Sequence, residues 1–330
     1  MRVSVALCTF NGARFLLDQL RSLAAQERKP DEIIICDDQS EDDTWQIIEE
    51  FRRRADFEII ATKNPQRLGA TKNFEKAISL ASGDIIFLCD QDDIWHPRKI
   101  RVFETVFSQN PQVCLVFSDA SVVDQDLRPL GYSVWKRFGF NAAGRRAVRD
   151  ARALEVLLRG NVVTGATAAF RSSLCQIALP IPSDWIHDGW LALIASAIGG
   201  IALIEEQLIE YRQHSSNQIG GTKMTRAQEL QCARQTGSAE YVLVAQQYIE
   251  ALRRLSGKER DWPGKSTSAA RHKRLIAGKI LHTYRRAEIH KRFAGRLSIV
   301  LSELITWRYF RYSNGMKSAA KDLFLWEQIG

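Results

Sequence analysis

The sequence lacks the patterns that mark several common classes of protein. Its 6 cysteines form no Cys-x-x-Cys pair and no metal-ligand spacing, and several lie within apolar runs, so we expect reduced, buried thiols. The apolar run at residues 1–8 is too short for a signal peptide, and no cleavage pattern follows it. The most apolar later stretch, residues 191–204, falls short of the roughly 20 residues that a membrane-spanning helix needs. We therefore expect a soluble or peripheral protein of the cytoplasm.

Two phosphate-binding motifs are missing as well. No Gly-x-Gly-x-x-Gly pattern follows the strand expected at residues 3–8, which argues against a dinucleotide-binding enzyme. The chain also has no Walker A lysine motif, which disfavours a P-loop nucleotidase. Any phosphate chemistry would therefore depend on a metal ion and on scattered polar side chains.

The net charge of +8 is unevenly distributed along the chain. Residues 223–330 contain 21 Lys and Arg against 9 Asp and Glu, whereas the 222 residues before them contain 25 against 29. Such asymmetry predicts two functional parts, of which the basic one faces something anionic. A membrane surface, a nucleic acid and an acidic substrate all fit this charge.

Strand-like and helix-like patterns alternate through the first half of the chain. This alternation predicts an α/β fold with a mostly parallel sheet covered by helices on both faces. The expected strands are residues 3–8, 32–36, 57–61, 84–89 and 113–117, and the expected helices are residues 14–25, 43–54, 73–81 and 97–107. Residues 131–150 are expected to form a loop or flap, and three basic segments, 225–256, 268–293 and 297–312, have the pattern of helices.

An acidic cluster directly follows the strand expected at residues 84–89. Asp90, Asp92 and Asp93 place three carboxylates within four residues, and burying them uncompensated would be costly. A divalent cation would compensate them, because hard oxygen ligands suit Mg²⁺ or Mn²⁺ and such ions usually share their coordination with phosphates. The cluster also fits a solvated acidic turn that caps the next helix, and taken alone it does not separate the two interpretations.

Polar side chains end two other expected strands, at Thr9 and Asn11 and at Asp37 and Asp38. Ligands of open α/β sheets bind outside the carboxyl ends of the strands, so this convergence favours the metal-phosphate site. Asp38 would accept hydrogen bonds from a ribose or a base, although this pair of aspartates would also serve as a helix cap. Lys72, in the turn before a helix, would neutralise a diphosphate, although an exposed, solvated lysine is the more common explanation.

Three later features suggest further chemistry. Asp188 would take the proton from a sugar hydroxyl, with His187 and the indole face of Trp190 contacting the acceptor; a helix cap and a core tryptophan are the structural alternatives. His214 would complete the coordination of a metal or bind phosphate, although a lone histidine is more often structural. The basic, aromatic tail at residues 296–312 would lie in a membrane interface or pack on the rest of the protein.

Taken together, these residues resemble the family 2 glycosyltransferases, which have the GT-A fold. The similarity is to the branch of bacterial rhamnosyltransferases and related O-antigen or polysaccharide transferases. It rests on residues 3–12, 34–40 and 90–95, with weaker support from residues 69–74, 187–190 and 211–217. We accordingly expect a GT-A catalytic domain at residues 1–221 and a basic helical extension at residues 222–330.

The resemblance implies a role for each matching residue. Asp90 and Asp92 would form the DXD pair, with Asp92 the direct metal ligand and Asp90 reaching the ribose or the metal through water. Asp188 matches the catalytic base of the family, and His214 lies where some GT-A enzymes place a late metal or diphosphate ligand. Asp93 would then be a structural cap. The side chains implied to bind the base and ribose of the nucleotide are Thr9, Asn11 and Asp38.

The implied activity is an inverting transfer of a sugar from a nucleotide diphosphate sugar to an acceptor hydroxyl, with Mn²⁺ or Mg²⁺ as the cofactor. The acceptor would be a saccharide or a lipid-linked saccharide in cell-surface polysaccharide or O-antigen assembly, and rhamnose is a candidate sugar. The expected location is the cytoplasm, with the basic helices as a candidate contact to the inner face of the cytoplasmic membrane, and no nucleic-acid partner is expected.

Two other hypotheses compete with this one. A sugar nucleotidyltransferase normally has a Gly-rich loop with Arg or Lys after the first strand, and residues 9–12 lack it. A membrane-associated scaffold with a degenerate catalytic domain conflicts with the intact DXD pair and Asp188.

Overall fold

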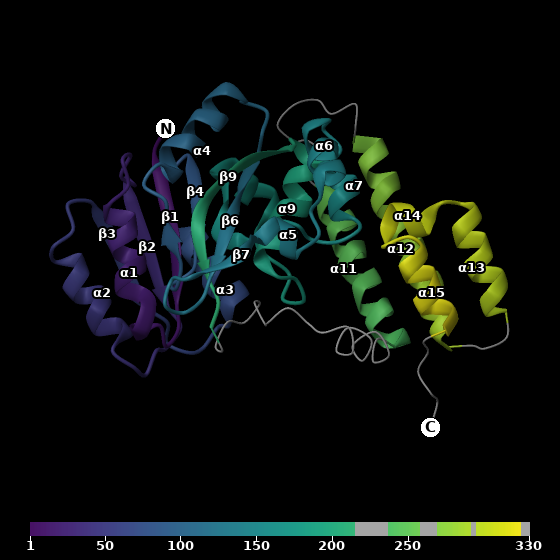
Figure 1. Cartoon of the computed structure of the whole chain (residues 1–330), viewed down its shortest axis with the longest axis horizontal. Helices are drawn as coiled ribbons and strands as arrows, with labels where there is room; N and C mark the ends of the chain where they lie inside the picture. Colours follow the sequence, from purple (N-terminus) through teal and green to yellow (C-terminus); the bar gives the residue numbers. More distant parts are fainter. Residues whose placement is uncertain (215–236, 258–268, 292–294, 325–330) are drawn as a thin grey trace. The chain divides into compact units, whose positions relative to one another are not determined.

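The computed structural model describes residues 1–214, 237–257, 269–291 and 295–324. The chain divides into two compact units (Figure 1). The first unit contains Met1–Ala151 and Val162–Gly221, and the second contains Arg152–Asn161 and Thr222–Gly330. Each unit is described by itself below.

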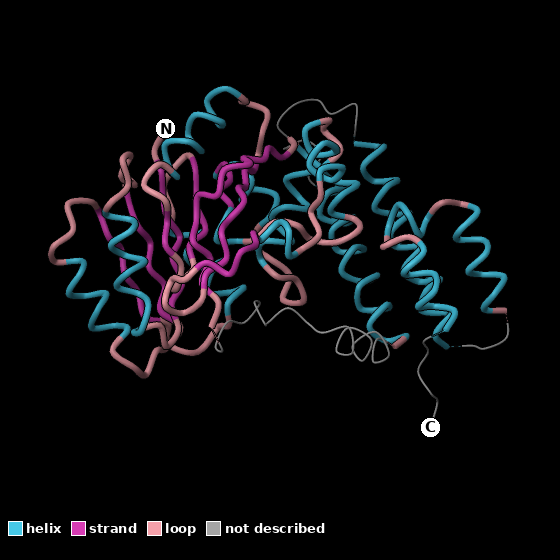
Figure 2. The backbone as a smooth tube through the Cα atoms, viewed as in Figure 1, coloured by secondary structure: helices cyan, strands magenta, loops and turns pink. Residues whose placement is uncertain are grey.

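The first unit is built on one mixed sheet, whose strands are magenta in Figure 2. Its strand order is β3-β2-β1-β4-β8-β6-β9-β5, and β7 pairs with β6. Strands β1 to β4 are mutually parallel, β6 is parallel to β9, and the remaining pairs are antiparallel. The strands are β1 Val3–Thr9, β2 Glu32–Asp37, β3 Glu58–Lys63, β4 Ile85–Cys89, β5 Ile94–Trp95, β6 Leu115–Val123, β7 Pro129–Ser133, β8 Ala168–Arg171 and β9 Ile201–Arg212. This architecture confirms the predicted α/β fold.

Helices cover the sheet and connect its strands. Because β1, β2 and β4 are buried on both faces, they are nearly continuous runs of Val, Ile, Leu and Cys, as the centre of a parallel sheet requires. The helices are α1 Ala13–Ala24, α2 Thr44–Arg52, α3 Ala70–Leu80, α4 Lys99–Gln109, α5 Val134–Arg137, α6 Ala142–Arg149, α8 Cys175–Ala178 and α9 His187–Ile198, with 3-10 turns η1 Gly165–Thr167 and η2 Ser172–Leu174.

The prediction of a loop or flap at residues 131–150 is wrong, because the structure has β7, α5 and α6 there. Two side chains cap the N-termini of these helices. Ser133 accepts a hydrogen bond from the N–H of Lys136, and Asn141 accepts one from the N–H of Gly144. Trp135 and Phe140 then pack on Phe117, with ring centroids 5.6 and 5.8 Å away. Short helices with glycines between them lack the long periodicity that reveals a helix in a sequence.

The described part of the second unit is helical. Its helices are α7 Ala153–Leu157, α11 Ser238–Gly257, α12 Ala269–Lys291, α13 Arg296–Ile305, α14 Arg308–Tyr312 and α15 Met316–Phe324. Part of the first predicted basic helix, residues 225–236, lies outside the described residues. The predicted helix 297–312 is divided at Trp307, whose φ of 58° ends α13. Among the described helices, none has the length and apolar character needed to cross a membrane.

A buried network of charges holds these helices together. The carboxylate of Asp322 is fully buried and accepts hydrogen bonds from Arg286 at 2.7 and 2.8 Å and from the hydroxyl of Tyr309 at 2.7 Å. His290 Nε2 lies 3.2 Å from the same carboxylate. Burial alone would raise the pKa of Asp322, but the hydrogen bonds from His290 and Arg286 outweigh it and lower the pKa to about 2.

This network predicts acid sensitivity in the second unit. Because the pKa of Asp322 is lower in the folded state than in the unfolded chain, its contribution of about 2 kcal/mol is present above pH 4 and is lost as the pH falls towards 2. We expect Asp322→Asn to lower the free energy of unfolding at pH 7 by about 3–5 kcal/mol and to flatten its dependence on pH in this window. Urea denaturation at pH 7 and pH 3 measures both effects. The exposed Glu288→Gln on α12 is the control and should change neither.

Candidate active site

The acidic loop after β4 lies at the edge of the sheet where β1 and β2 also end. Leu7 of β1 pairs with Cys89 of β4, and Thr9 pairs with Asp37 of β2, so the three carboxyl ends are adjacent. Asp90 and Asp92 are half-buried in this loop. Burial first, and then the charges of Asp92 and Asp188, raise the pKa of Asp90 to about 7. The structure thus gathers the carboxylates that the sequence predicts to act together.

Asp93 has a different place from its neighbours. Its side chain is fully buried, and its Oδ1 accepts a hydrogen bond of 3.0 Å from the backbone N–H of Arg212 at the end of β9. The prediction of a structural role is therefore consistent with the geometry, but the bond ties the acidic loop to β9 and does not cap a helix.

The loop after β1 is fixed against the acidic loop through Gln91. The side-chain amide of Gln91 accepts the N–H of Phe10 at 2.9 Å and donates to the carbonyl of Phe10 at 3.0 Å. Gly12 permits this contact, because a Cβ at that position would lie 2.1 Å from Gln91 Oε1. Asn11 adopts a positive φ of 47° and accepts the N–H of Glu41 at 2.9 Å. The two loops therefore form one preorganised surface.

The two aspartates at the end of β2, Asp37 and Asp38, have different hydrogen-bond partners. Asp37 accepts the hydroxyl of Thr9 at 2.9 Å and is fully buried. Asp38 accepts Asn64 Nδ2 at 2.9 Å and the backbone N–H groups of Leu68 and Gly69 at 2.7 and 2.9 Å. Asp38 thus orders the turn before α3 and does not cap its own following helix. Asp38 is buried, and an ionised carboxylate accepts about four hydrogen bonds, so a contact with a nucleotide would have to use the one acceptor position that these three bonds leave. That contact stays a prediction.

Lys72 is held by the protein. Its Nζ donates to Glu75 Oε2 at 2.8 Å and to the carbonyl of Ile181 at 2.6 Å. These bonds join α3 to the segment before α9 and use two of its three donors. The structural explanation of Lys72 accounts for its position, and a contact with a diphosphate stays a prediction.

Asp188 lies in the first turn of α9, and hydrogen bonds from the backbone orient both of its carboxylate oxygens. Its Oδ2 accepts the N–H of Gly165 at 3.0 Å, and its Oδ1 accepts the N–H of Gly189 at 2.5 Å. The partner of Asp188, Gly165, belongs to η1, which packs against β4, and the charge of Asp188 contributes to the raised pKa of Asp90 in the acidic loop. The two segments are about 100 residues apart in the sequence, and the fold brings them into one site.

The expectation that His187 and Trp190 contact an acceptor is corrected by their burial. Trp190 is fully buried and donates its indole N–H to the carbonyl of Ala178 at 2.7 Å. His187 stacks on Phe74 at a centroid distance of 4.0 Å, and burial lowers its pKa to about 3. Both side chains belong to the core, because α9 is buried along almost its whole length. The half-buried Trp185, which the sequence analysis did not single out, lies 5.5 Å from the Trp190 ring.

His214 and Asp92 meet although 122 positions separate them. His214 Nε2 lies 2.8 Å from Asp92 Oδ2, and the imidazole packs on Phe15 with centroids 4.7 Å apart. Within the described residues, no three His, Cys, Asp or Glu side chains group as a complete metal site. A hard divalent ion that shares its coordination with substrate phosphates needs only one or two protein ligands, so this donor pair fits such an ion.

Two buried cations lie beside the acidic loop, and the sequence alone assigned a definite role to neither. Arg212 is 3% exposed and donates to the carbonyls of Asp92 and Gln125, both at 2.8 Å. Lys99 is fully buried, with its Nζ 3.4 Å from the centroid of the Trp95 ring and 2.7 Å from the carbonyl of Ala166. Burial lowers the pKa of Lys99 to about 7, although the neighbouring Cys89, Asp93 and Asp90 act in the opposite direction. A lysine at the start of a helix resembles a solvated residue, so no sequence signal marks it.

Lys99 should therefore be essential to the stability of the acidic loop. We expect Lys99→Met to lower the free energy of unfolding by about 3–5 kcal/mol, because Asp93 and Asp90 lose a buried positive charge that interacts with them. Thermal and urea denaturation measure this loss. The exposed Lys136→Met is the control, and an equal effect of both variants would contradict the assigned position of Lys99.

Comparison with known proteins assigns part of the chain to a family. Residues 4–167 match the family model described as glycosyl transferase family 2. The chain carries a family 2 glycosyltransferase domain. An uncharacterized glycosyltransferase of Nostoc, alr2836, is 26% identical over 238 residues, covering 69% of this chain and 70% of that protein. The chain spans only 59% of the length of three uncharacterized mycobacterial relatives.

Solved glycosyltransferases share the fold of this chain. The structure of S. aureus TarS 1-349 in complex with UDP-GlcNAc has a TM-score of 0.55 at 15% identity and covers 97% of this chain and 90% of that chain. The mannosyltransferase PcManGT from Pyrobaculum calidifontis, in complex with GDP-Man and Mn²⁺, has a TM-score of 0.51 at 17% identity and covers 98% and 84%. These similarities confirm the predicted GT-A fold.

Proposed function

We propose that this glycosyltransferase moves a sugar from a nucleotide diphosphate donor to an acceptor hydroxyl, with a divalent metal and inversion at the anomeric carbon. The observation that supports it most is the meeting of Asp92, His214, Asp90 and Asp188 at the carboxyl ends of the strands. The metal and nucleotide sugar bound by PcManGT, and the UDP-GlcNAc bound by TarS, agree with this choice of cofactor and donor.

Asp92 and His214 would hold Mn²⁺ or Mg²⁺, and Asp90 would reach the ribose or the ion through water. When bound, the metal supplies positive charge to the leaving diphosphate. Arg212 keeps the loop in position through the Asp92 carbonyl. Thr9, Asn11 and Asp38 would bind the base and ribose. Lys72 would reach the diphosphate with its remaining donor.

Asp188 would act as the catalytic base. Its carboxylate takes the proton of the acceptor hydroxyl as the hydroxyl oxygen attacks the anomeric carbon. The new bond joins that oxygen to the sugar, the bond to the diphosphate oxygen breaks, and the leaving diphosphate retains its electron pair. The N–H groups of Gly165 and Gly189 each bind one oxygen of the Asp188 carboxylate and fix its direction before the substrate arrives.

The acceptor is proposed to be a saccharide or a lipid-linked saccharide used in cell-surface polysaccharide or O-antigen assembly. The motifs of the sequence resemble the rhamnosyltransferase branch, which makes a rhamnosyl donor a candidate. Thermal-shift measurements with a panel of nucleotide sugars and Mn²⁺ or Mg²⁺ test the donor class. We expect one nucleotide series to raise the melting temperature in the presence of metal. If no nucleotide sugar shifts the transition and none is hydrolysed, the proposed activity is wrong.

The second unit would bring the enzyme to an anionic membrane through α13. Leu297, Leu301 and Ile305 lie four residues apart on one exposed face of α13, and Ile305 is 77% exposed. The opposite face is buried at Val300. This stripe and the basic charge of residues 223–330 match the chemistry of an anionic bilayer surface.

The turn after α13 provides another exposed side chain that could contact the membrane. Trp307 is 66% exposed and has a positive φ of 58°, a costly conformation for a bulky residue. Tryptophan prefers the membrane–water interface, so a membrane would give this exposed ring a favourable environment.

Charged substitutions on the stripe test this contact. We expect Leu301→Asp/Ile305→Asp to abolish flotation with vesicles of phosphatidylcholine and phosphatidylglycerol, because burial of each side chain contributes about 1.5–3 kcal/mol. Leu243→Asp/Leu281→Asp changes two exposed leucines on α11 and α12 and is the matched control. Equal flotation of the two double variants would remove the membrane contact.

A further inference from the structure

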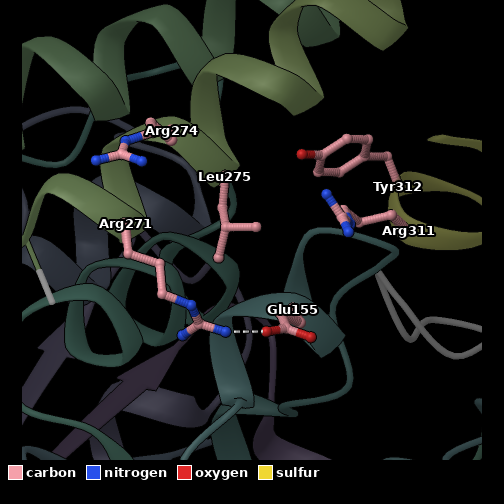
Figure 3. Close-up of a pocket in the computed structure, with 6 residues that line it drawn as sticks. All are labelled: Glu155, Arg271, Arg274, Leu275, Arg311 and Tyr312. Carbon is pink, nitrogen blue, oxygen red and sulfur yellow. Dashed lines mark hydrogen bonds and ion pairs between the residues drawn. The ribbon is translucent and has the colours of Figure 1, made fainter. Parts of the chain in front are cut away.

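The second unit contains a cavity of 290 Å³ that the transfer reaction does not use (Figure 3). All six residues that line it belong to this unit: Glu155, Arg271, Arg274, Leu275, Arg311 and Tyr312. Three of the six are arginines, and the wall contains one carboxylate. The side chains come from α7, α12 and α14, so the helical packing of the unit assembles the cavity.

The positive charge of the cavity is only partly neutralised by the described residues. Arg271 forms an ion pair with Glu155, as the dashed line in Figure 3 marks. Arg274 and Arg311 have no carboxylate within ion-pair distance in the part of the chain that the structure describes. The lining therefore has two positive charges in excess. Like charges in a hollow repel one another, and an anion relieves the repulsion.

The position of α12 adds to this field. Arg271 and Arg274 lie in the first two turns of the helix, whose first turn has no acidic residue. A helix N-terminus is equivalent to about half a positive charge and is stabilised by anions, so arginines there are unfavourable without one. The chain thus combines a positive helix end with positive side chains at the same wall.

Tyr312 provides an uncharged donor at a position that Gly278 makes accessible. A Cβ on Gly278 would lie 2.0 Å from the phenolic oxygen of Tyr312, so the ring packs directly on the backbone of α12. Figure 3 shows the hydroxyl turned towards Leu275, with Arg311 beside the ring. The side chain of Tyr312 is buried, which fixes its direction, and Tyr312 is one of the residues that line the cavity.

We propose that this cavity binds a phosphate group. Guanidinium groups match phosphate oxygens with paired, charge-assisted hydrogen bonds, and a tyrosine hydroxyl supplies a further donor. The same chemistry serves a free phosphate or diphosphate and the phosphomonoester headgroup of a lipid. The site differs from the proposed transfer site in residues and in unit, so either can fail without the other.

Calorimetric titration of the full chain with inorganic phosphate and pyrophosphate, at constant ionic strength, tests the proposal. We expect saturable binding that weakens by about tenfold or more in Arg274→Gln/Arg311→Gln, because charge-assisted bonds are lost. Arg253→Gln/Lys317→Gln removes the same charge from exposed positions outside the cavity and should bind like the unmodified chain. An equal loss in both double variants would mean general charge screening and would overturn the proposal.

Glu155→Gln should change the affinity for phosphate in the opposite direction from the arginine variants. It removes the carboxylate that repels an anion and occupies Arg271, so we expect severalfold tighter binding of phosphate. If the cavity is only an ion-paired contact between helices, this variant will lower stability without any gain in affinity. A gain in phosphate affinity would therefore indicate a ligand site, and a loss of stability without this gain would indicate a structural contact.

Vesicles distinguish the two sources of phosphate. Phosphatidylcholine vesicles with phosphatidic acid present a phosphomonoester, and binding that Arg274→Gln/Arg311→Gln reduces would assign a lipid headgroup. Binding of inorganic phosphate or pyrophosphate without this vesicle effect would assign a soluble ligand. No saturable binding in any of these arms would overturn the proposal.

Discussion

Asp92→Ala is expected to reduce sugar transfer by about 10²–10³-fold or more while leaving the fold intact, because charge on the leaving diphosphate loses its compensation. Asp92 is half-buried at a loop, and its carboxylate contacts His214 at 2.8 Å. The backbone carbonyl that Arg212 binds remains in the variant, so the loop keeps its main anchor. Initial rates with the donor found by thermal shift, together with circular dichroism, measure both parts of this expectation.

The surface variant Asp126→Ala is the matched control for Asp92. It removes a carboxylate that is 52% exposed on the turn after β6 and should transfer sugar normally. If Asp92→Ala retained full activity, or if excess chelator left the unmodified enzyme active, the role of Asp92 would be wrong. A similar loss in both variants would point to unspecific damage.

Asp188→Asn should keep donor binding and lose transfer by about 10²–10⁴-fold, since a general base contributes a factor of this size. The amide is nearly the same shape as the carboxylate but cannot accept the proton of the acceptor. We therefore expect a large fall in kcat with little change in the donor KM. Steady-state kinetics and donor titration of the same preparation separate the two parameters.

Asp184→Asn is the companion control, because Asp184 lies exposed four residues before Asp188. It should behave like the unmodified enzyme. Unimpaired transfer by Asp188→Asn would reassign the base to another group, and weak donor binding would assign Asp188 to the donor site.

The sequence predicted the sheet, and the polar side chains that lie at its edge, for one physical reason. The central strands are buried on both faces, so they are short continuous apolar runs, and the polar residues that end them at Thr9, Asp38 and Asp90 stand out. Parallel strands bring these ends to one edge. The contact of His214 with Asp92 was not itself predicted, but the chemistry of histidine and the family resemblance had suggested His214 as a metal or diphosphate ligand.

Residues whose role depends on tertiary burial escaped prediction. Lys99 looks like an exposed lysine at a helix start, and only packing against Trp95 and Ala166 makes it an internal cation. Trp190 looks like a sugar platform beside a catalytic aspartate, but α9 is apolar on nearly all sides and buries it. Short helices such as α6 are stabilised by a cap and a few core contacts, which periodicity does not reveal.

The most direct test of the account is calorimetric titration of the protein with nucleoside diphosphates, with Mn²⁺ and then with excess chelator. We expect one nucleoside diphosphate to bind in the presence of Mn²⁺, and we expect chelator or Asp92→Ala to weaken this binding by at least about tenfold, since a metal would join the diphosphate to the carboxylate. Asp126→Ala should bind like the unmodified protein. Equal affinity with Mn²⁺, with chelator and in Asp92→Ala would contradict a metal-bridged diphosphate site at the end of β4.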